Sequence, residues 1–354
     1  MTKLRIALLL AIGVVIGVPG VAPDLAPISS AIAQANTNSN IRPPCTPRPD
    51  PSQLVSGRNC RNVTVDGFVR EFLVYVPEDL TPGEPVPIVF AYHYGTGSME
   101  LFSAMSGFRA IGQREGFIVV FPQALQYYSA SEGVWTARWN TYGLEQRTDL
   151  ARLPGYPEAS PWPADDVAFT LAMIEQIQTQ WTIDDRRIYA AGFSNGAALA
   201  TRLAREIPDV IAAVSASSAG FSGGLSSASD LSPAARSVPI LLMVGARDRF
   251  LTAANDGAAF PLDPAALVAP SNPFDALTEA FGYSSLPCAT ELSAENALLL
   301  MEFCDTNAAD GVGELVFALL AGMGHSYPSP VNNAAGLDAA EFAWAFFRAH
   351  PLPE

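Results

Sequence analysis

One serine stands in a setting that would suit a nucleophile. Residues 192–196 read Gly-Phe-Ser-Asn-Gly, which fits the pattern G-x-S-x-G around Ser194. The short pattern arises often by chance, so its weight comes from its surroundings. The stretch 187–191, apolar after Arg187, predicts a buried strand, and the alanine-rich stretch 197–204 predicts a helix. A serine on a sharp turn between strand and helix can attack a carbonyl carbon. An ordinary glycine-rich turn is the alternative.

Such a serine needs a base, and the chain has three histidines. His325 directly follows the last predicted strand, which is where a nucleophile of this kind finds its base. His93 ends an earlier strand, and His350 lies on an amphipathic helix close to Glu354, where a surface or helix-capping role fits better. We therefore predict His325 as the base, with a purely structural histidine as the alternative.

An acid that orients the histidine should lie between Ser194 and His325 and follow a strand. Asp248 meets this requirement because it follows the apolar strand predicted at 240–244. Asp256 is the second candidate. Aspartate is also common in turns and at helix N-termini, which is the alternative role for Asp248.

The negative oxygen that forms during acyl transfer needs hydrogen-bond donors. We predict the backbone N–H groups of Asn195 and Tyr94, because Tyr94 follows the strand predicted at 87–93. Trp139 and Tyr94 are the predicted substrate contacts, with plain packing as the alternative. Asp165 and Asp166 open a helix, and we assign these carboxylates to helix capping rather than catalysis.

Apolar runs alternate with helical patterns along the chain. Strands are predicted at 70–76, 87–93, 117–121, 187–191, 211–216, 240–244 and 314–320. Helices are predicted at 99–115, 165–180, 195–206, 274–281 and 337–350. This alternation predicts an α/β fold with a mostly parallel central sheet flanked by helices on both faces. The long segments 123–164 and 217–238 are placed over the active site, although surface decoration is an alternative.

The termini and composition predict an exported globular protein. Residues 1–35 have the features of a signal peptide, with an uncleaved N-terminal anchor as the alternative. Residues 36–53 form an extended proline-rich arm, and residues 54–354 form the catalytic domain. We expect a secreted protein, either extracellular or periplasmic. The sequence carries no indication of the oligomeric state.

Charge and cysteine content narrow the partners. The formal net charge of −15 disfavours binding to nucleic acid, acidic polymers or anionic membranes. The four cysteines of an exported chain predict disulfides, and proximity favours Cys45–Cys60 and Cys288–Cys304. No C-x-x-C spacing indicates zinc or redox chemistry, and we expect neither a metal nor a cofactor.

Together these stretches resemble the secreted polyhydroxybutyrate depolymerase and feruloyl esterase group of α/β-hydrolases. The resemblance runs from about residue 57 to residue 325, and its most specific parts are 165–169 and 183–196. It implies the α/β-hydrolase fold and a triad of Ser194, Asp248 and His325. Cys288, Cys304 and the following Gly-Met-Gly-His look like the paired cysteines and histidine motif of the group.

The chain also departs from the group's pattern. Tyr94 stands where the group usually has glycine in the oxyanion loop, and Tyr327 replaces a tryptophan. The segment around Asp248 keeps the glycine and the aspartate of the group but lacks its neighbouring histidine and Val-Pro pair. The first of these departures falls on the predicted second oxyanion donor.

The predicted function is a serine carboxylic ester hydrolase that acts through an acyl-enzyme. Hydroxyalkanoate polyesters or oligomers and feruloyl or acetyl esters are the expected substrates. Crystalline polyester is less favoured, because such enzymes often carry a further binding domain and this chain stops at Glu354. The alternatives are a prolyl-oligopeptidase-type peptidase, for which no propeller domain is present, and an inactive binding protein, against which the intact triad argues.

Overall fold

The fold is seen in a computed structural model of the chain. It describes residues 53–81, 83–144, 148–149, 164–219, 236–253, 256–267, 278, 281–305 and 314–354. The predicted signal peptide, Cys45, nearly all of the predicted arm and most of the predicted helix 274–281 lie outside these ranges. So do parts of the segments 123–164 and 217–238. The predicted domain boundaries and the Cys45–Cys60 pairing stay predictions.

One large sheet forms the centre of the described chain. Its strands run in the order β1-β2-β4-β3-β7-β8-β9-β12-β11-β10. In that order they span Gly57–Val65, Phe68–Val76, Ile118–Pro122, Val86–Tyr92, Ile183–Phe193, Ala213–Ser217, Ile240–Gly245, Glu314–Leu320, Leu298–Cys304 and Ala289–Leu292. The strands from β4 to β12 pair in parallel, and antiparallel strands extend both edges. The carboxyl ends of the parallel strands therefore meet along one side of the molecule.

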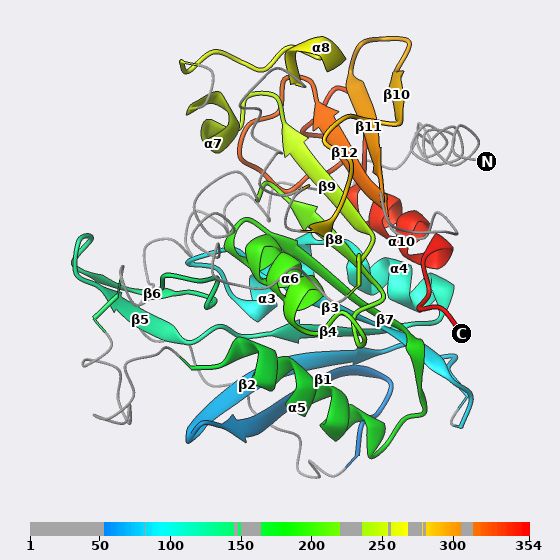
Figure 1. Cartoon of the computed structure of the whole chain (residues 1–354). Coiled ribbons are helices and arrows are strands. Elements are labelled where there is room, and N and C mark those ends of the chain that lie inside the picture. Colours follow the sequence, from blue (N-terminus) through cyan, green and yellow to red (C-terminus); the bar gives the residue numbers. More distant parts are fainter. Residues whose placement is uncertain are drawn as a thin grey trace.

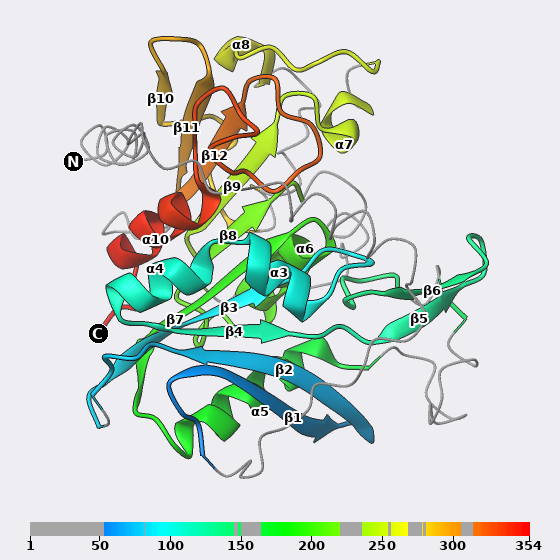
Figure 2. The ribbon, with the colours of Figure 1, turned by 180° about the vertical axis from the view of Figure 1, so that it is seen from behind.

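Helices cover both faces of this sheet (Figures 1 and 2). The helices α5 (Asp166–Gln178) and α6 (Asn195–Glu206) lie on one face, and α3 (Met99–Met105), α4 (Phe108–Glu115) and α10 (Ala339–Ala349) lie on the other. Two separate apolar cores fill the two interfaces. Because both sides of the central strands are buried, the strands read as nearly continuous apolar runs.

Smaller elements decorate the carboxyl ends of the strands. The short helices α7 (Arg249–Thr252) and α8 (Pro264–Leu267) follow β9. The hairpin of β5 (Gln126–Ser129) and β6 (Val134–Ala137) forms its own small sheet, which projects from the body in Figure 1. Its base lies beside the start of α6, so it contributes to the site described below.

The predicted architecture is confirmed, with local corrections. Each of the seven predicted strands overlaps an observed one. The single helix predicted over 99–115 is wrong, because Gly107 adopts a left-handed conformation (φ 82°) and separates α3 from α4. The sequence interpretation also missed β1, β5, β6, β10 and β11.

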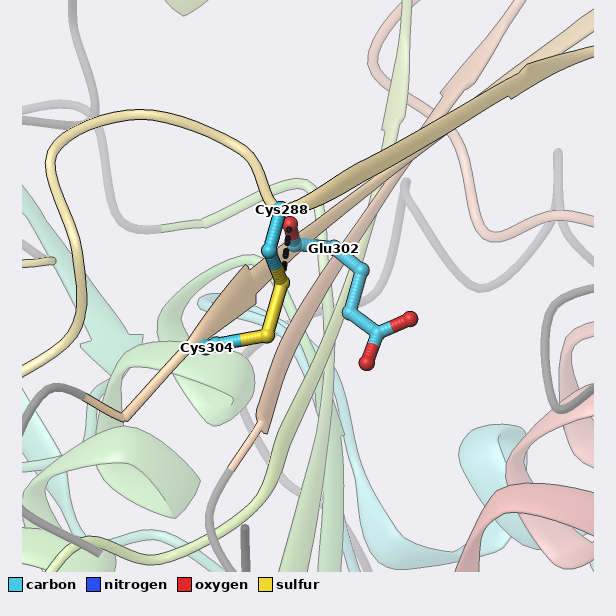
Figure 3. A group of neighbouring side chains, drawn as sticks. All are labelled: Cys288, Glu302 and Cys304. Atoms are coloured by element: carbon cyan, nitrogen blue, oxygen red, sulfur yellow. Dashed lines mark hydrogen bonds between the residues drawn. A yellow bond between two sulfur atoms is a disulfide. The ribbon is translucent and has the colours of Figure 1, made fainter. Parts of the chain in front are cut away.

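The disulfide Cys288–Cys304 is confirmed and ties the start of β10 to the end of β11 (Figure 3). Glu302 lies beside it, and its backbone oxygen accepts the N–H of Cys288 at 2.8 Å. The Sγ atom of Cys288 lies 3.3 Å from the same oxygen, the contact that Figure 3 marks. Among the described residues, only this trio gathers side chains in a metal-like cluster. The two sulfur atoms are bonded to each other, so neither is available as a thiolate ligand. No helix in the described ranges is long and apolar enough to cross a bilayer.

Candidate active site

Ser194 occupies the sharp turn between β7 and α6. Its backbone has φ 53° and ψ −118°, a conformation that residues with a side chain rarely adopt. Its N–H donates to the backbone oxygen of Ser217 at the end of β8, at 2.8 Å. The strained turn lifts the hydroxyl clear of the helix and directs it toward the ends of the neighbouring strands.

Two glycines make this turn possible. A Cβ at Gly192 would lie 2.4 Å from backbone atoms of Gly196, and a Cβ at Gly196 would lie 2.2 Å from the backbone oxygen of Tyr92. Any side chain at either position would push the start of α6 away from β7 or from the end of β3. The glycines of the motif therefore fix the serine against the loop that follows β3.

The structure brings the three predicted triad residues together. Ser194 Oγ lies 2.9 Å from His325 Nε2, and His325 Nδ1 lies 2.8 Å from Asp248 Oδ2. A carboxylate only accepts hydrogen bonds, so Nδ1 carries the proton and Nε2 is left to accept the serine hydroxyl. The rings of Phe193 and Phe250 flank the imidazole, with centroids 5.3 and 5.0 Å away.

Asp248 is fully buried and charged. Burial by itself would raise the pKa of this carboxyl, but hydrogen bonds from His325 and from the N–H of Phe250 hold the pKa below its ordinary value. The same carboxylate caps α7, so the helix-capping role and the position beside the histidine coincide. Asp256, the second candidate acid, lies on the surface.

The loops that carry the acid and the histidine touch backbone to backbone. The N–H of Arg247 donates to the backbone oxygen of Met323 at 2.8 Å. A Cβ at Gly245 would lie 2.2 Å from that same oxygen and 2.6 Å from the oxygen of Gly324. A side chain at position 245 would therefore force Asp248 and His325 apart.

Ser218 is a site residue that the sequence interpretation missed. It directly follows β8, has φ 54° and is buried. Its hydroxyl donates to the backbone oxygen of Ser326 at 3.5 Å, and its N–H donates to the oxygen of Met243 at 2.8 Å. The hydroxyl also lies near Asp248 and helps to lower the pKa of that carboxyl. No motif surrounds it. Its place at the carboxyl end of the strand next to β7 is the one signal that could have indicated it.

The other two histidines have structural roles. His93 is fully buried, and its Nδ1 lies 2.7 Å from the backbone oxygen of Tyr94 while its Nε2 accepts the N–H of Ala124 at 3.1 Å. These bonds hold the loop after β3. His350, at the end of α10, uses Nδ1 to bond the backbone oxygen of Phe346 at 2.8 Å.

The predicted oxyanion residues lie on adjoining segments. Asn195 begins α6, so its N–H is one of the unsatisfied donors of a helix N-terminus. Tyr94 is half-buried with its ring against Phe193, and burial raises the pKa of its phenol. A Cβ at the next residue, Gly95, would lie 3.5 Å from Asn195 Cβ. The two loops are thus close enough to share one small ligand.

Trp139 joins these loops. Its N–H donates to Asn195 Oδ1 at 2.8 Å, and its indole Nε1 donates to the backbone oxygen of His93 at 2.7 Å. The side chain is fully buried and connects the elbow to the predicted oxyanion loop through these two hydrogen bonds. A direct contact of Trp139 with substrate stays a prediction.

Of the paired aspartates at the start of α5, Asp165 has the capping role assigned to it, whereas Asp166 does not cap the helix. Asp165 caps the helix by accepting the N–H groups of Val167 and Ala168. Asp166 forms a buried ion pair with Arg70 at 2.5 Å and accepts the N–H of Asn140 at 2.6 Å. Asp166 thereby anchors the segment that carries Trp139.

Comparison with known proteins places this geometry in a family. The model of the family described as "Esterase PHB depolymerase" matches residues 71–271, which include the serine elbow and Asp248. The chain belongs to this family of PHB depolymerase esterases. Membership agrees with the resemblance found in the sequence.

Individual relatives of this esterase-family chain match only part of their own length. Feruloyl esterase B of Piromyces equi is 29% identical over 179 residues, 51% of this chain and 29% of that protein. The putative esterase NocK of Nocardia uniformis subsp. tsuyamanensis is 30% identical over 159 residues, 44% of this chain and 39% of that protein. The chain thus spans well under half the length of either relative.

A solved structure supports the fold. The acetyl xylan esterase from Aspergillus awamori superimposes with a TM-score of 0.50 at 17% identity, covering 82% of this chain and 99% of that one. Together with the sheet order and the elbow, this confirms the α/β-hydrolase fold for the family member described here.

The glycine contact between the acid and histidine loops makes a matched prediction. Gly245→Ala should lower the free energy of unfolding by about 1–3 kcal/mol or more, because its Cβ has no room. Gly324→Ala faces the same loop pair, but its Cβ would meet only Arg247 O, at 3.8 Å. We expect that variant to change stability by less than about 1 kcal/mol. Urea unfolding of both variants checks this, and equal effects would contradict the steric argument.

Proposed function

We propose that this chain is a serine carboxylic ester hydrolase in which Ser194 is the nucleophile, His325 the general base and acid, and Asp248 the orienting carboxylate. The observation that carries the proposal is a continuous chain of two hydrogen bonds. It runs from Ser194 Oγ to His325 Nε2 at 2.9 Å and from His325 Nδ1 to Asp248 at 2.8 Å. An inactive scaffold would have no need to maintain the strained elbow.

The first half-reaction forms an acyl-enzyme. Ser194 Oγ attacks the ester carbonyl carbon while its proton passes to His325 Nε2. Asp248 stabilises the resulting imidazolium, because its lowered pKa keeps it ionised. The tetrahedral intermediate then collapses: the carbon–oxygen bond to the alcohol breaks, and the alcohol leaves with the proton from Nε2.

The second half-reaction releases the acid. A water molecule gives its proton to Nε2 and attacks the acyl carbon, and the bond to Ser194 Oγ breaks as Oγ regains a proton. In both halves the oxyanion would accept the N–H groups of Asn195 and Tyr94. The N-terminal dipole of α6 adds favourable charge at the same place.

We infer that the substrates are feruloyl or acetyl esters or polyesters. Support comes from the family and from relatives named as feruloyl esterase B, bifunctional acetylxylan esterase/xylanase and oxidized polyvinyl alcohol hydrolase. We further propose a secreted protein, extracellular or periplasmic, on the strength of the leader-like residues 1–35 and the Cys288–Cys304 disulfide.

Replacement of the nucleophile tests this proposal. Ser194→Ala should lower kcat for p-nitrophenyl butyrate by at least about 10³-fold and abolish labelling by a fluorophosphonate probe. Ser329→Ala, a serine on the loop before α10, serves as the control and should keep both properties. Full activity in Ser194→Ala would refute the proposal, and a wild-type chain that neither turns over ester nor takes the probe would indicate an inactive scaffold.

The acid assignment has its own matched pair. Asp248→Asn removes the charge that stabilises the imidazolium and favours the wrong tautomer, so kcat should fall about 10³–10⁴-fold. Asp256→Asn changes an exposed carboxylate and should leave kcat within about twofold. Steady-state kinetics on p-nitrophenyl butyrate distinguish the two aspartates, and the reverse ranking would move the acid to position 256.

A further inference from the structure

A polar cavity of about 260 Å³ adjoins the serine elbow at Asn195. Its walls come from the β5–β6 hairpin and the segment that follows it. Half of the described residues that line it carry hydroxyl groups: Ser129, Ser131, Thr136, Thr141, Tyr142 and Thr148. The hydroxyl of Thr136 is buried in this wall without a hydrogen-bond partner. A buried hydroxyl normally has a partner, so Thr136 is a hydroxyl of this wall that a bound polar group could satisfy. The hydroxyls of Tyr142 and Thr148 already donate to Glu206 and to the backbone oxygen of Leu144.

Arg138 is the one cation in the described lining of this cavity. Its backbone N–H donates to the backbone oxygen of Leu125 at 3.0 Å, so the backbone of this residue is held in place. A Cβ placed on Gly95 would lie 3.0 Å from the guanidinium Nη1 and 3.5 Å from Asn195 Cβ. The guanidinium therefore lies beside the oxyanion loop and the elbow, within reach of a bound substrate.

The present partner of this arginine is weak. Glu132 lies 3.8 Å from the guanidinium, and its own side chain is 52% exposed. An exposed ion pair at such a distance contributes little, and a better-placed carboxylate could replace it. Because the net charge is −15, an anionic substrate would be repelled by the chain as a whole unless a local cation offset the repulsion.

We propose that Arg138 binds a free carboxylate on the substrate, so that the enzyme prefers esters bearing a carboxylate a few atoms from the scissile bond. The inference rests on the proposed function for the location of the scissile bond. The planar guanidinium matches a carboxylate with two parallel hydrogen bonds, and the hydroxyls of the cavity can bind the remaining polar atoms. Two sources share this chemistry: the acid end of a hydroxyalkanoate oligomer and a uronic acid unit of an esterified polysaccharide.

Binding to the Ser194→Ala chain tests the inference without turnover. The first ligand pair is the 3-hydroxybutyrate dimer and its primary amide, and the second is an acetylated glucuronic acid and its amide. Calorimetry should show that the acid of at least one pair binds about 10–100-fold more tightly than its neutral isostere. The pair that shows the preference identifies the source of the carboxylate.

Substitution of the arginine then assigns the preference. Arg138→Gln in the same background should remove the preference for the acid and leave binding of the amide nearly unchanged. Arg138→Lys should keep part of the preference for the acid, because lysine retains the positive charge but cannot form the two parallel hydrogen bonds of a guanidinium. Arg109→Gln, a charge-matched change on α4, should have no effect.

Several outcomes would overturn the inference. Equal binding of acid and amide in both pairs is one, and a preference that survives Arg138→Gln is another. Turnover gives a third: if Arg138→Gln in the active chain lowers kcat for acid and amide equally, the guanidinium stabilises the oxyanion instead. Absence of activity toward neutral esters in the wild-type chain would count against the proposed function. The binding test does not require turnover and would still decide the present inference.

Discussion

The close approach of backbone to backbone at three glycines is the constraint on which the site depends. Gly192 and Gly196 let α6 start directly against the ends of β7 and β3, which holds Ser194 in a backbone conformation it would otherwise avoid. Gly245 lets the loop after β9 touch the loop after β12. These contacts align side chains from three separate strand ends to within hydrogen-bond distance.

Around these backbone contacts, buried polar groups hold the residues of the proposed site. Asp248 accepts hydrogen bonds from His325 and from the N–H of Phe250, which keep its pKa low despite burial. On the opposite side, Trp139 ties Asn195 to the strand end at His93. These hydrogen bonds hold donors and acceptors in place before substrate binds. Such preorganisation is the condition for stabilising charge as it develops in the reaction.

The parallel core and the elbow could be predicted from the sequence because both depend on local signals. The helix predicted at 195–206 matches α6 in both bounds. The buried parallel strands are recognisable in the sequence as apolar runs. The edge strands β1 and β10 were missed because they are only partly buried and so do not form apolar runs. The strand β11 is an apolar run that the sequence interpretation overlooked. Ser218 and Arg138 were missed because neither stands in a motif. Their importance comes only from which loops the topology places side by side.

The most direct test of the account is to trap the covalent intermediate that it requires. Rapid acid quench of the wild-type chain during hydrolysis of p-nitrophenyl butyrate, followed by intact-mass and peptide mass spectrometry, should show one butyryl group. That group should map to the peptide containing Ser194 and be absent when His325 is replaced. Steady turnover with no acyl group on Ser194 at any quench time, or an acyl group on another residue, would contradict the account.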